Sequence, residues 1–251
     1  QDYTYHRFQP QTYNRFDNYQ ANSEAKADTI ETHSYNKNLA HQLTFYAEDE
    51  MTLNEKWSLN GGVNADVFHI SGKTFATLSP RLSMKFQPTE RLSLKASYTL
   101  MSQFVHKIAN SFLDLPTDYW VPTTARLHPM RSWQVAAGAY MKPNKHWLLS
   151  LEAYYKRSSH ILQYSSWAGL EPPAANWDYM VMEGDGRSYG VELDADYNVS
   201  NLTLHGSYTL SWTEKKFDDF YDGWYYDKFD NRHKLTLTGR WNITKKIAAF
   251  A

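Results

Sequence analysis

The strongest constraint on the fold is a two-residue alternation of apolar and polar side chains. In residues 57–67, WSLNGGVNADV, the odd-numbered positions carry apolar or small residues such as Trp57, Leu59 and Val63, and the even-numbered positions carry Ser, Asn, Gly and Asp. Successive side chains of a strand point to opposite faces, so this period predicts a β-strand with one apolar and one polar face.

The same alternation recurs in about ten segments along the chain. Each is close to the ~9–11 residues that a tilted strand needs to cross a hydrocarbon core. Short polar turns alternate with longer connections, an asymmetry typical of up-and-down outer-membrane barrels. Further alternating segments lie at 78–88, 91–100, 147–156, 188–197, 202–212 and 234–243, and the longer connections lie at 105–130, 158–186 and 214–230.

Composition narrows the possible classes of protein. The 251 residues include 26 Lys plus Arg, 27 Asp plus Glu and no Cys, which excludes disulfides and thiolate metal sites. A net charge of -1 argues against a nucleic-acid partner, because such binding depends on clustered cations. The mean hydropathy of -0.66 fits a soluble protein, but it also fits a transmembrane barrel, whose lipid-facing and lumen-facing residues alternate.

The distribution of charges and rings indicates which face is wet. Aromatic rings collect at the membrane–water boundary, because the ring prefers the apolar side and its polar group prefers water. The apolar face is therefore predicted to contact outer-membrane lipid, and the polar face to line a hydrated lumen. Rings beside the short turns are Trp57, Phe86, Trp147, Tyr197 and Trp241, and charged residues of the predicted lumen wall are Lys95, Glu152, Glu192, Asp194 and Arg240.

Hydrocarbon adds a closure requirement, since every strand N–H and C=O needs a partner there. The chain begins in a polar stretch that lacks the alternation, and it ends at IAAFA, where a further strand begins. The predicted fold class is therefore all-β, an antiparallel up-and-down transmembrane β-barrel. The chain is predicted to supply about ten strands of a larger barrel.

Several stretches resemble the C-terminal half of the barrel of TonB-dependent outer-membrane receptors. Residues 184–197, GDGRSYGVELDADY, are similar to a Gly-x-x-x-Gly-x-Glu strand of that family, and residues 229–243 are similar to its Asp-x-Arg-His strand entry. Residues 78–100 resemble its hairpin that opens with Ser-Pro-Arg. Residues 115–140 resemble a loop and strand in which the family commonly has Glu-Ser, where this chain has Arg131-Ser132.

The resemblance implies a barrel of about 22 strands with a plugged lumen, in the outer membrane of a Gram-negative bacterium. It further implies import of a scarce ligand, energised by the TonB complex through the plug. Residues 1–251 are interpreted as a segment of the barrel domain, without the plug domain and the final strands. An iron chelate, a cobalamin, a peptide and an oligosaccharide all remain possible ligands, and a surface lipoprotein partner stays open. No cofactor is predicted.

Aromatic residues in the long connections are the candidate ligand contacts, because rings stack on sugar faces and on flat aromatic chelators. The alternative is that they pack loop on loop into an ordered cap. The candidates are Tyr119, Trp120, Trp167, Trp177, Tyr179, Trp224 and Tyr225.

Two alternatives to a receptor barrel make distinct predictions. A soluble all-β carbohydrate- or lipid-binding module would bury the apolar face and purify without detergent. An outer-membrane lipase or protease would need a nucleophile and a base, and no Gly-x-Ser-x-Gly or His-Glu-x-x-His motif is present. Glu192, Asp194 and Asp196 are spaced ~7 Å apart along one face, where water solvates each of them. No enzyme activity and no metal site is predicted.

Overall fold

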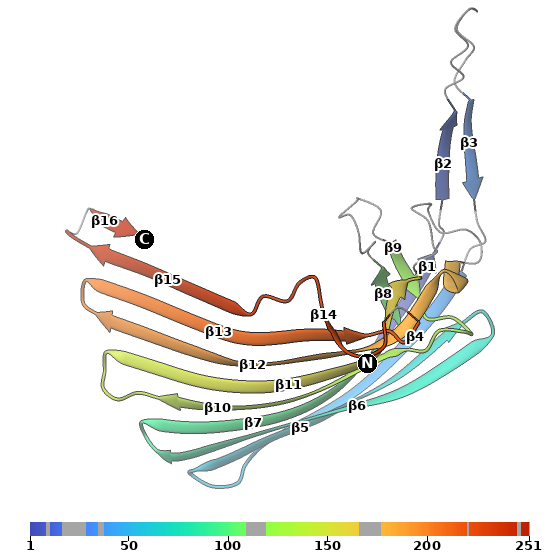
Figure 1. Ribbon diagram of the computed structural model, residues 1–251. Helices are drawn as coiled ribbons and strands as arrows, with labels where there is room; N and C mark the ends of the chain where they lie inside the picture. The colour runs from blue at the N-terminus through green and yellow to red at the C-terminus, as the bar shows by residue number, and fades with distance from the viewer. Residues whose placement is uncertain are drawn as a thin grey trace, which may run out of the picture.

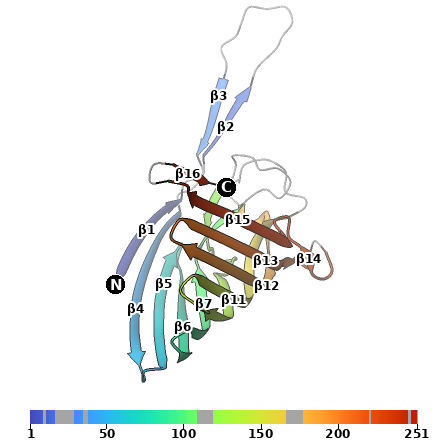
Figure 2. The same cartoon turned by 90° about the vertical axis from the view of Figure 1, so that its left-hand side faces the viewer.

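A computed structural model describes residues 1–8, 11–16, 29–34, 38–108, 119–165, 177–219, 221–244 and 247–250. Within these residues, one curved antiparallel sheet of twelve strands dominates (Figures 1 and 2). Across the sheet the order is β1 (Asp2–Phe8), β4 (Asn38–Thr52), β5 (Trp57–Ile70), β6 (Lys73–Thr89), β7 (Leu92–Gln103), β10 (Met130–Met141), β11 (Trp147–Tyr164), β12 (Val181–Val199), β13 (Leu202–Lys216), β15 (His233–Asn242) and β16 (Ala248–Phe250), with β14 (Tyr225–Tyr226) paired to β13.

Along this path the strands lie side by side in the order in which they occur in the chain, which confirms the up-and-down topology. The turn between β5 and β6 is tight, and so are the turns at the short-turn end of the sheet. Two separate hairpins rise from the end opposite the short turns (Figure 1). These hairpins are β2 (Gln11–Phe16) with β3 (Thr29–Ser34), and β8 (Val105–Ile108) with β9 (Tyr119–Pro122). None of the helical residues in the described ranges builds a helix long and apolar enough to span a bilayer.

The sequence pattern underestimated the extent of some strands. Residues 2–8 form β1, although their alternation is weak, because the edge of β4 offers them a complete antiparallel register from Asp2 to Phe8. The connection predicted at 158–186 is also shorter, since β11 continues to Tyr164 and β12 begins at Val181. Pairing with a neighbouring strand satisfies backbone groups whatever the side-chain pattern, so it extends strands beyond the alternating region.

A recurring Asn-x-x-Trp sequence shapes two of the short turns. The side-chain Oδ1 of Asn54 accepts hydrogen bonds from the backbone N–H of Lys56 at 2.9 Å and of Trp57 at 3.0 Å. Asn144 accepts equivalent bonds at its turn, including one of 3.3 Å from Trp147. The Asn side chain therefore closes the turn and fixes the residue at which the next strand begins.

The large apolar side chains of the alternating face remain exposed on the outside of the sheet. Leu193, near the middle of β12, is 49% exposed, and others of comparable exposure are Leu78, Leu82, Leu151, Leu204, Leu235 and Leu237. A soluble module with an apolar interior would bury these residues, so that alternative is wrong. The apolar face is thus exposed, as the predicted contact with lipid requires.

The rings beside the short turns form a lower aromatic belt. The Trp57 and Phe86 ring centroids lie 4.3 Å apart, and those of Trp147 and Tyr197 lie 4.8 Å apart. Both pairs join neighbouring strands on the outer face. Stacking across the strand pairs therefore adds to their amphipathic preference for the membrane boundary.

An upper aromatic belt, which the sequence analysis did not identify, runs across four strands on the same face. Tyr189 stacks on Tyr155 at 6.1 Å and on Trp212 at 5.2 Å, and Trp133 lies 5.4 Å from Tyr155. In the next row beyond the belt, three directly paired outer positions are charged. They are Arg157, Arg187 and Glu214.

The two belts set the height of the apolar band. Tyr155 is eight residues from Trp147 along β11, and Tyr189 is eight from Tyr197 along β12. At ~3.3 Å per residue this is about 26 Å of strand, or about 20 Å of height at a tilt of ~40°. The result is close to the ~25 Å apolar band of outer-membrane barrels. The strands therefore have the length needed to cross one.

Candidate ligand site at the loop end

The predicted lumen wall is a row of polar contacts between strands on the inner face. Glu152 lies directly opposite Glu192, and the Tyr140 hydroxyl donates to Glu152 over 2.6 Å. The Lys95 ammonium sits 4.4 Å from the centre of the Tyr140 ring. Gly138 separates Lys95 from Glu152, and a Cβ there would lie 3.0 Å from the Glu152 Cγ. These residues place mixed charges side by side on a polar, accessible surface.

The remaining wall residues lie on neighbouring strands. Asp194 accepts a hydrogen bond of 3.3 Å from Ser150. Arg240 donates to the Asn242 side chain at 3.1 Å, and its guanidinium lies 5.4 Å from the Phe250 ring centre. Their role as a lumen lining stays a prediction.

A cap of non-barrel chain packs at the loop end. It consists of β8, β9, residues 123–129 and the short 3₁₀ helix η1 (Trp177–Tyr179). One small core joins this cap to the ends of β11 and β12, and a second lies against β4 and β5. The first contains Ile108, Val121, Leu127, Trp177 and Val181, and the second contains Ala40, Phe68, Ile70 and Phe104. Burial of these side chains holds the cap on the barrel wall.

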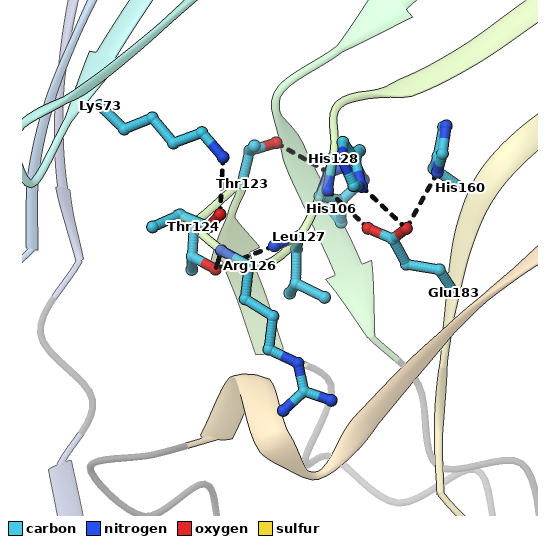
Figure 3. A network of polar contacts seen from close by, with 10 residues as sticks. Lys73, His106, Thr123, Thr124, Arg126, Leu127, His128, His160 and Glu183 are labelled. Atoms are coloured by element: carbon cyan, nitrogen blue, oxygen red, sulfur yellow. Dashed lines mark hydrogen bonds and ion pairs between the residues drawn. The ribbon is translucent and has the colours of Figure 1, made fainter.

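Polar bonds fix the course of residues 123–129 (Figure 3). The Lys73 ammonium donates to the Ala125 carbonyl at 2.6 Å, which ties the segment to β6. The Thr124 hydroxyl accepts from the backbone N–H groups of Arg126 and Leu127, each at 3.2 Å. The segment is therefore held at both its turn and its contact with the sheet.

The aromatic candidates divide between exposed and packed positions. Trp120 is 61% exposed and Tyr179 is 60% exposed, with the Arg126 guanidinium 4.4 Å over the Tyr179 ring. Trp177 is only 6% exposed and packs in the cap core, as the alternative of loop-on-loop packing expects. Of these three rings, Trp120 and Tyr179 are open to a ligand.

Two further candidates lie on the connection between β13 and β15. Trp224 is half-buried, with the Arg187 guanidinium 4.3 Å from its ring centre. Tyr225 donates from its hydroxyl to Gln163 at 3.4 Å. Both rings therefore contact the barrel wall beyond the upper belt. Trp167 and the side chain of Tyr119 lie outside the described residues.

His106 is a buried titratable group in the cap. It is 4% exposed, and its Nε2 lies 3.2 Å from the Thr123 hydroxyl. Burial lowers the pKa of His106 to about 4, and the charge of Glu183 opposes part of that shift. The imidazole is therefore neutral in the folded cap at neutral pH.

Acidification should loosen the cap through His106. An unfolded histidine has a pKa near 6.5, so its protonation favours the open cap. Above pH 6.5 His106 is neutral in both the folded and the open cap, and the folded cap has its full stability. As the pH falls from 6.5 toward 4, only the open cap binds the proton, so the folded cap loses stability, by about 2 kcal/mol at pH 5. The protection factors of the amides in residues 105–108 and 119–121, which are corrected for the intrinsic pH dependence of exchange, should fall between pH 7 and pH 5. Equal protection at both values, or the same change in a His106→Gln variant, would contradict this.

A second group of titratable residues meets at the border between the cap and the barrel (Figure 3). The Glu183 Oε2 lies 2.9 Å from Nδ1 of His160 and 3.1 Å from Nδ1 of His128. The backbone N–H of His128 donates to the Glu183 Oε1 at 2.5 Å. Burial alone would raise the pKa of Glu183, but these hydrogen bonds outweigh it and lower the pKa. Both carboxylate oxygens are thus engaged.

His160 reaches Glu183 because of an irregularity in β11. The register steps from Ser159 opposite Asp185 to Ile161 opposite Gly184, so His160 is the extra residue of a β-bulge. Its φ of 58° is left-handed, which costs a non-glycine residue about 1–2 kcal/mol. The sequence alone does not predict this group, because no local motif links residues 128, 160 and 183.

The apolar band between two aromatic belts, the polar inner face and the loop-end cap define a segment of an outer-membrane β-barrel. The TonB-dependent receptor-like β-barrel family matches residues 1–248, and the chain belongs to this family. Its members are receptors and transporters of the Gram-negative outer membrane rather than enzymes, as the sequence resemblance implied. No curated protein matches the chain.

Solved structures agree on the fold. The ferric-catecholate import receptor Fiu from E. coli K12 is 13% identical with a TM-score of 0.66, covering 99% of this chain and 40% of its own. The siderophore receptor PiuA from Acinetobacter baumannii is 12% identical with a TM-score of 0.62, covering 89% and 34%. The FrpB iron transporter from Neisseria meningitidis is 16% identical with a TM-score of 0.59, covering 83% and 31%. The chain therefore spans between about a third and two fifths of the length of these proteins.

Proposed function

We propose that this chain is part of the barrel domain of a receptor that imports an extracellular ligand, energised by TonB through a plug domain elsewhere in the protein. The observation that carries the proposal is the division of the sheet into a lipid-facing apolar band and a polar wall with an ordered cap above it. A wall of mixed charges suits a hydrated passage, and the cap presents exposed rings to the outside.

The ligand class that we propose is an iron chelate. The similar structures include an iron transporter, a ferric-catecholate import receptor and a siderophore receptor, which supports this class over a cobalamin, a peptide or an oligosaccharide. Trp120 and Tyr179 offer ring faces for a flat aromatic chelator, and Arg126 beside Tyr179 adds a positive charge for an anionic one. A surface lipoprotein is not part of this proposal.

Uptake of a radiolabelled ferric tris-catecholate by cells with this receptor as their sole route tests the proposal. Uptake should stop when TonB is deleted. A Trp120→Ala, Tyr179→Ala double variant should raise the half-saturating concentration about 10-fold, because two stacking contacts contribute about 0.5–1.5 kcal/mol each.

Leu53→Ala is the matched control, since Leu53 is equally exposed but lies in a turn at the opposite end of the barrel. Its half-saturating concentration should equal that of the wild type at equal surface abundance. TonB-independent uptake would contradict the transport mechanism. Uptake of another ligand class in place of the chelate would contradict the ligand assignment.

A further inference from the structure

The group formed by His128, His160 and Glu183 has the composition of a metal site. One ligand atom from each residue can be chosen so that all three lie within 4.8 Å of one another. The residues come from three separate parts of the fold: the segment before β10, the bulge of β11 and the start of β12. No metal site is predicted from the sequence, and none of the three residues is among the proposed ligand contacts.

The distances suit a small tetrahedral ion. Zinc lies about 2.0–2.2 Å from imidazole nitrogen and carboxylate oxygen, which sets tetrahedral ligand atoms about 3.4 Å apart. The two Nδ1 atoms lie 2.9 and 3.1 Å from the shared Glu183 Oε2. Both nitrogen–oxygen distances are therefore a few tenths of an ångström short of this value, and the three ligand atoms lie within 4.8 Å of one another. The His128 side chain is 59% exposed and has room to move as the ligands close around an ion.

The surroundings prepare these side chains for an ion. The His128 backbone N–H holds the Glu183 Oε1 and leaves Oε2 facing both imidazoles, as supporting hydrogen bonds do around metal ligands. The left-handed bulge turns His160 toward the same point. The exposed His128 side chain leaves a path for entry from solvent.

We propose that His128, His160 and Glu183 bind one transition-metal dication of the Zn²⁺ class, with water completing the coordination. Two imidazoles and one carboxylate suit zinc better than the oxygen-preferring Mg²⁺ or Ca²⁺. The bound ion would tie residues 123–129 of the cap to the β11–β12 hairpin. This proposal concerns the cap itself and does not depend on which ligand the receptor transports.

Zinc binding to the complete receptor chain, purified metal-free in detergent, tests the site. Isothermal titration with ZnCl₂, checked by elemental analysis after gel filtration, should find one equivalent bound and none for MgCl₂. His160→Gly should weaken zinc binding more than the roughly 10–100-fold that losing a supporting hydrogen bond costs. Glycine accepts the left-handed φ, so this variant keeps the bulge and should fold.

His205→Ala is the matched control, because His205 Nδ1 lies 2.9 Å from Asp196 Oδ1 in a pair to which the described residues add no third metal ligand. It should bind zinc as the wild type does. Absence of zinc from the wild type, or an equal loss in His205→Ala and His160→Gly, would overturn the site.

Trypsin provides a readout of the tie to the cap. Arg126 is exposed within the segment that the ion would hold. Zinc should slow cleavage after Arg126 in the wild type and leave the rate unchanged in His160→Gly, as followed by mass spectrometry. Equal acceleration or slowing in both proteins would overturn the tie. Neither measurement involves transport, so their failure leaves the proposed function intact.

Discussion

A Leu193→Arg variant should fail to assemble in the outer membrane or should assemble with a large loss of stability. Leu193 lies on the outer face of β12, midway between the rings of Tyr189 and Tyr197 that mark the two boundaries. An arginine at this depth meets hydrocarbon, which costs about 2–4 kcal/mol in a transmembrane barrel. The folded fraction in outer-membrane extracts and the urea midpoint of protein refolded in lipid vesicles would measure the loss.

The matched control is Ser207→Arg on the neighbouring strand. Ser207 lies directly opposite Asp194 on the inner face, so the same charge would meet water and a carboxylate. Its folded fraction and urea midpoint should stay close to those of the wild type. Equal stability of Leu193→Arg and the wild type, or equal damage from both substitutions, would contradict the assigned orientation of the sheet.

A Gly190→Val variant should separate β12 from β13. A Cβ at Gly190 would lie 2.7 Å from the backbone oxygen of Leu210 and 3.1 Å from the Cα of Ser211. Backbone atoms in a sheet cannot move aside without breaking the ladder, so the clash should cost at least about 1–3 kcal/mol. The expected result is a lower urea midpoint and faster amide exchange in β13.

Gly186→Val on the same strand and face is the comparison. There an added Cβ would meet the Ile161 Cδ1 at 3.4 Å, the Ser158 Cβ at 3.8 Å and the Glu214 backbone oxygen at 3.9 Å, which are ordinary contacts. This variant should remain close to wild-type stability. The prediction is wrong if valine is tolerated equally at both glycines.

Much of the barrel could be read from the sequence, because its physical cause is local. The alternation through Trp57 and Val63 assigns each residue of β5 to a face without knowledge of its neighbours. The turns at Asn54 and Asn144 act within three residues of the side chain that closes them. Predictions for strand β1 were poorer, because its structure depends on the edge of β4 rather than on its own pattern.

The candidate sites were only partly readable. The sequence supplied Trp120, Trp177 and Tyr179 as equivalent loop rings, and packing against the cap core then buried one of them. The upper belt could not be predicted from the sequence either, because Tyr155 and Tyr189 form a belt only by stacking on each other across adjacent strands. Neighbour relations of this kind follow from register, which no single segment contains.

The sequence by itself determined that this protein builds a sheet with one face for lipid and one for water, since each side chain's face follows from its position along its own strand. Only the tertiary structure decided that His128, His160 and Glu183 meet. The pairing of β11 with β12, the bulge at His160 and the return of the cap segment together bring these distant residues within bonding distance. Such convergence depends on how separate segments pack, and it leaves no periodic trace in the chain.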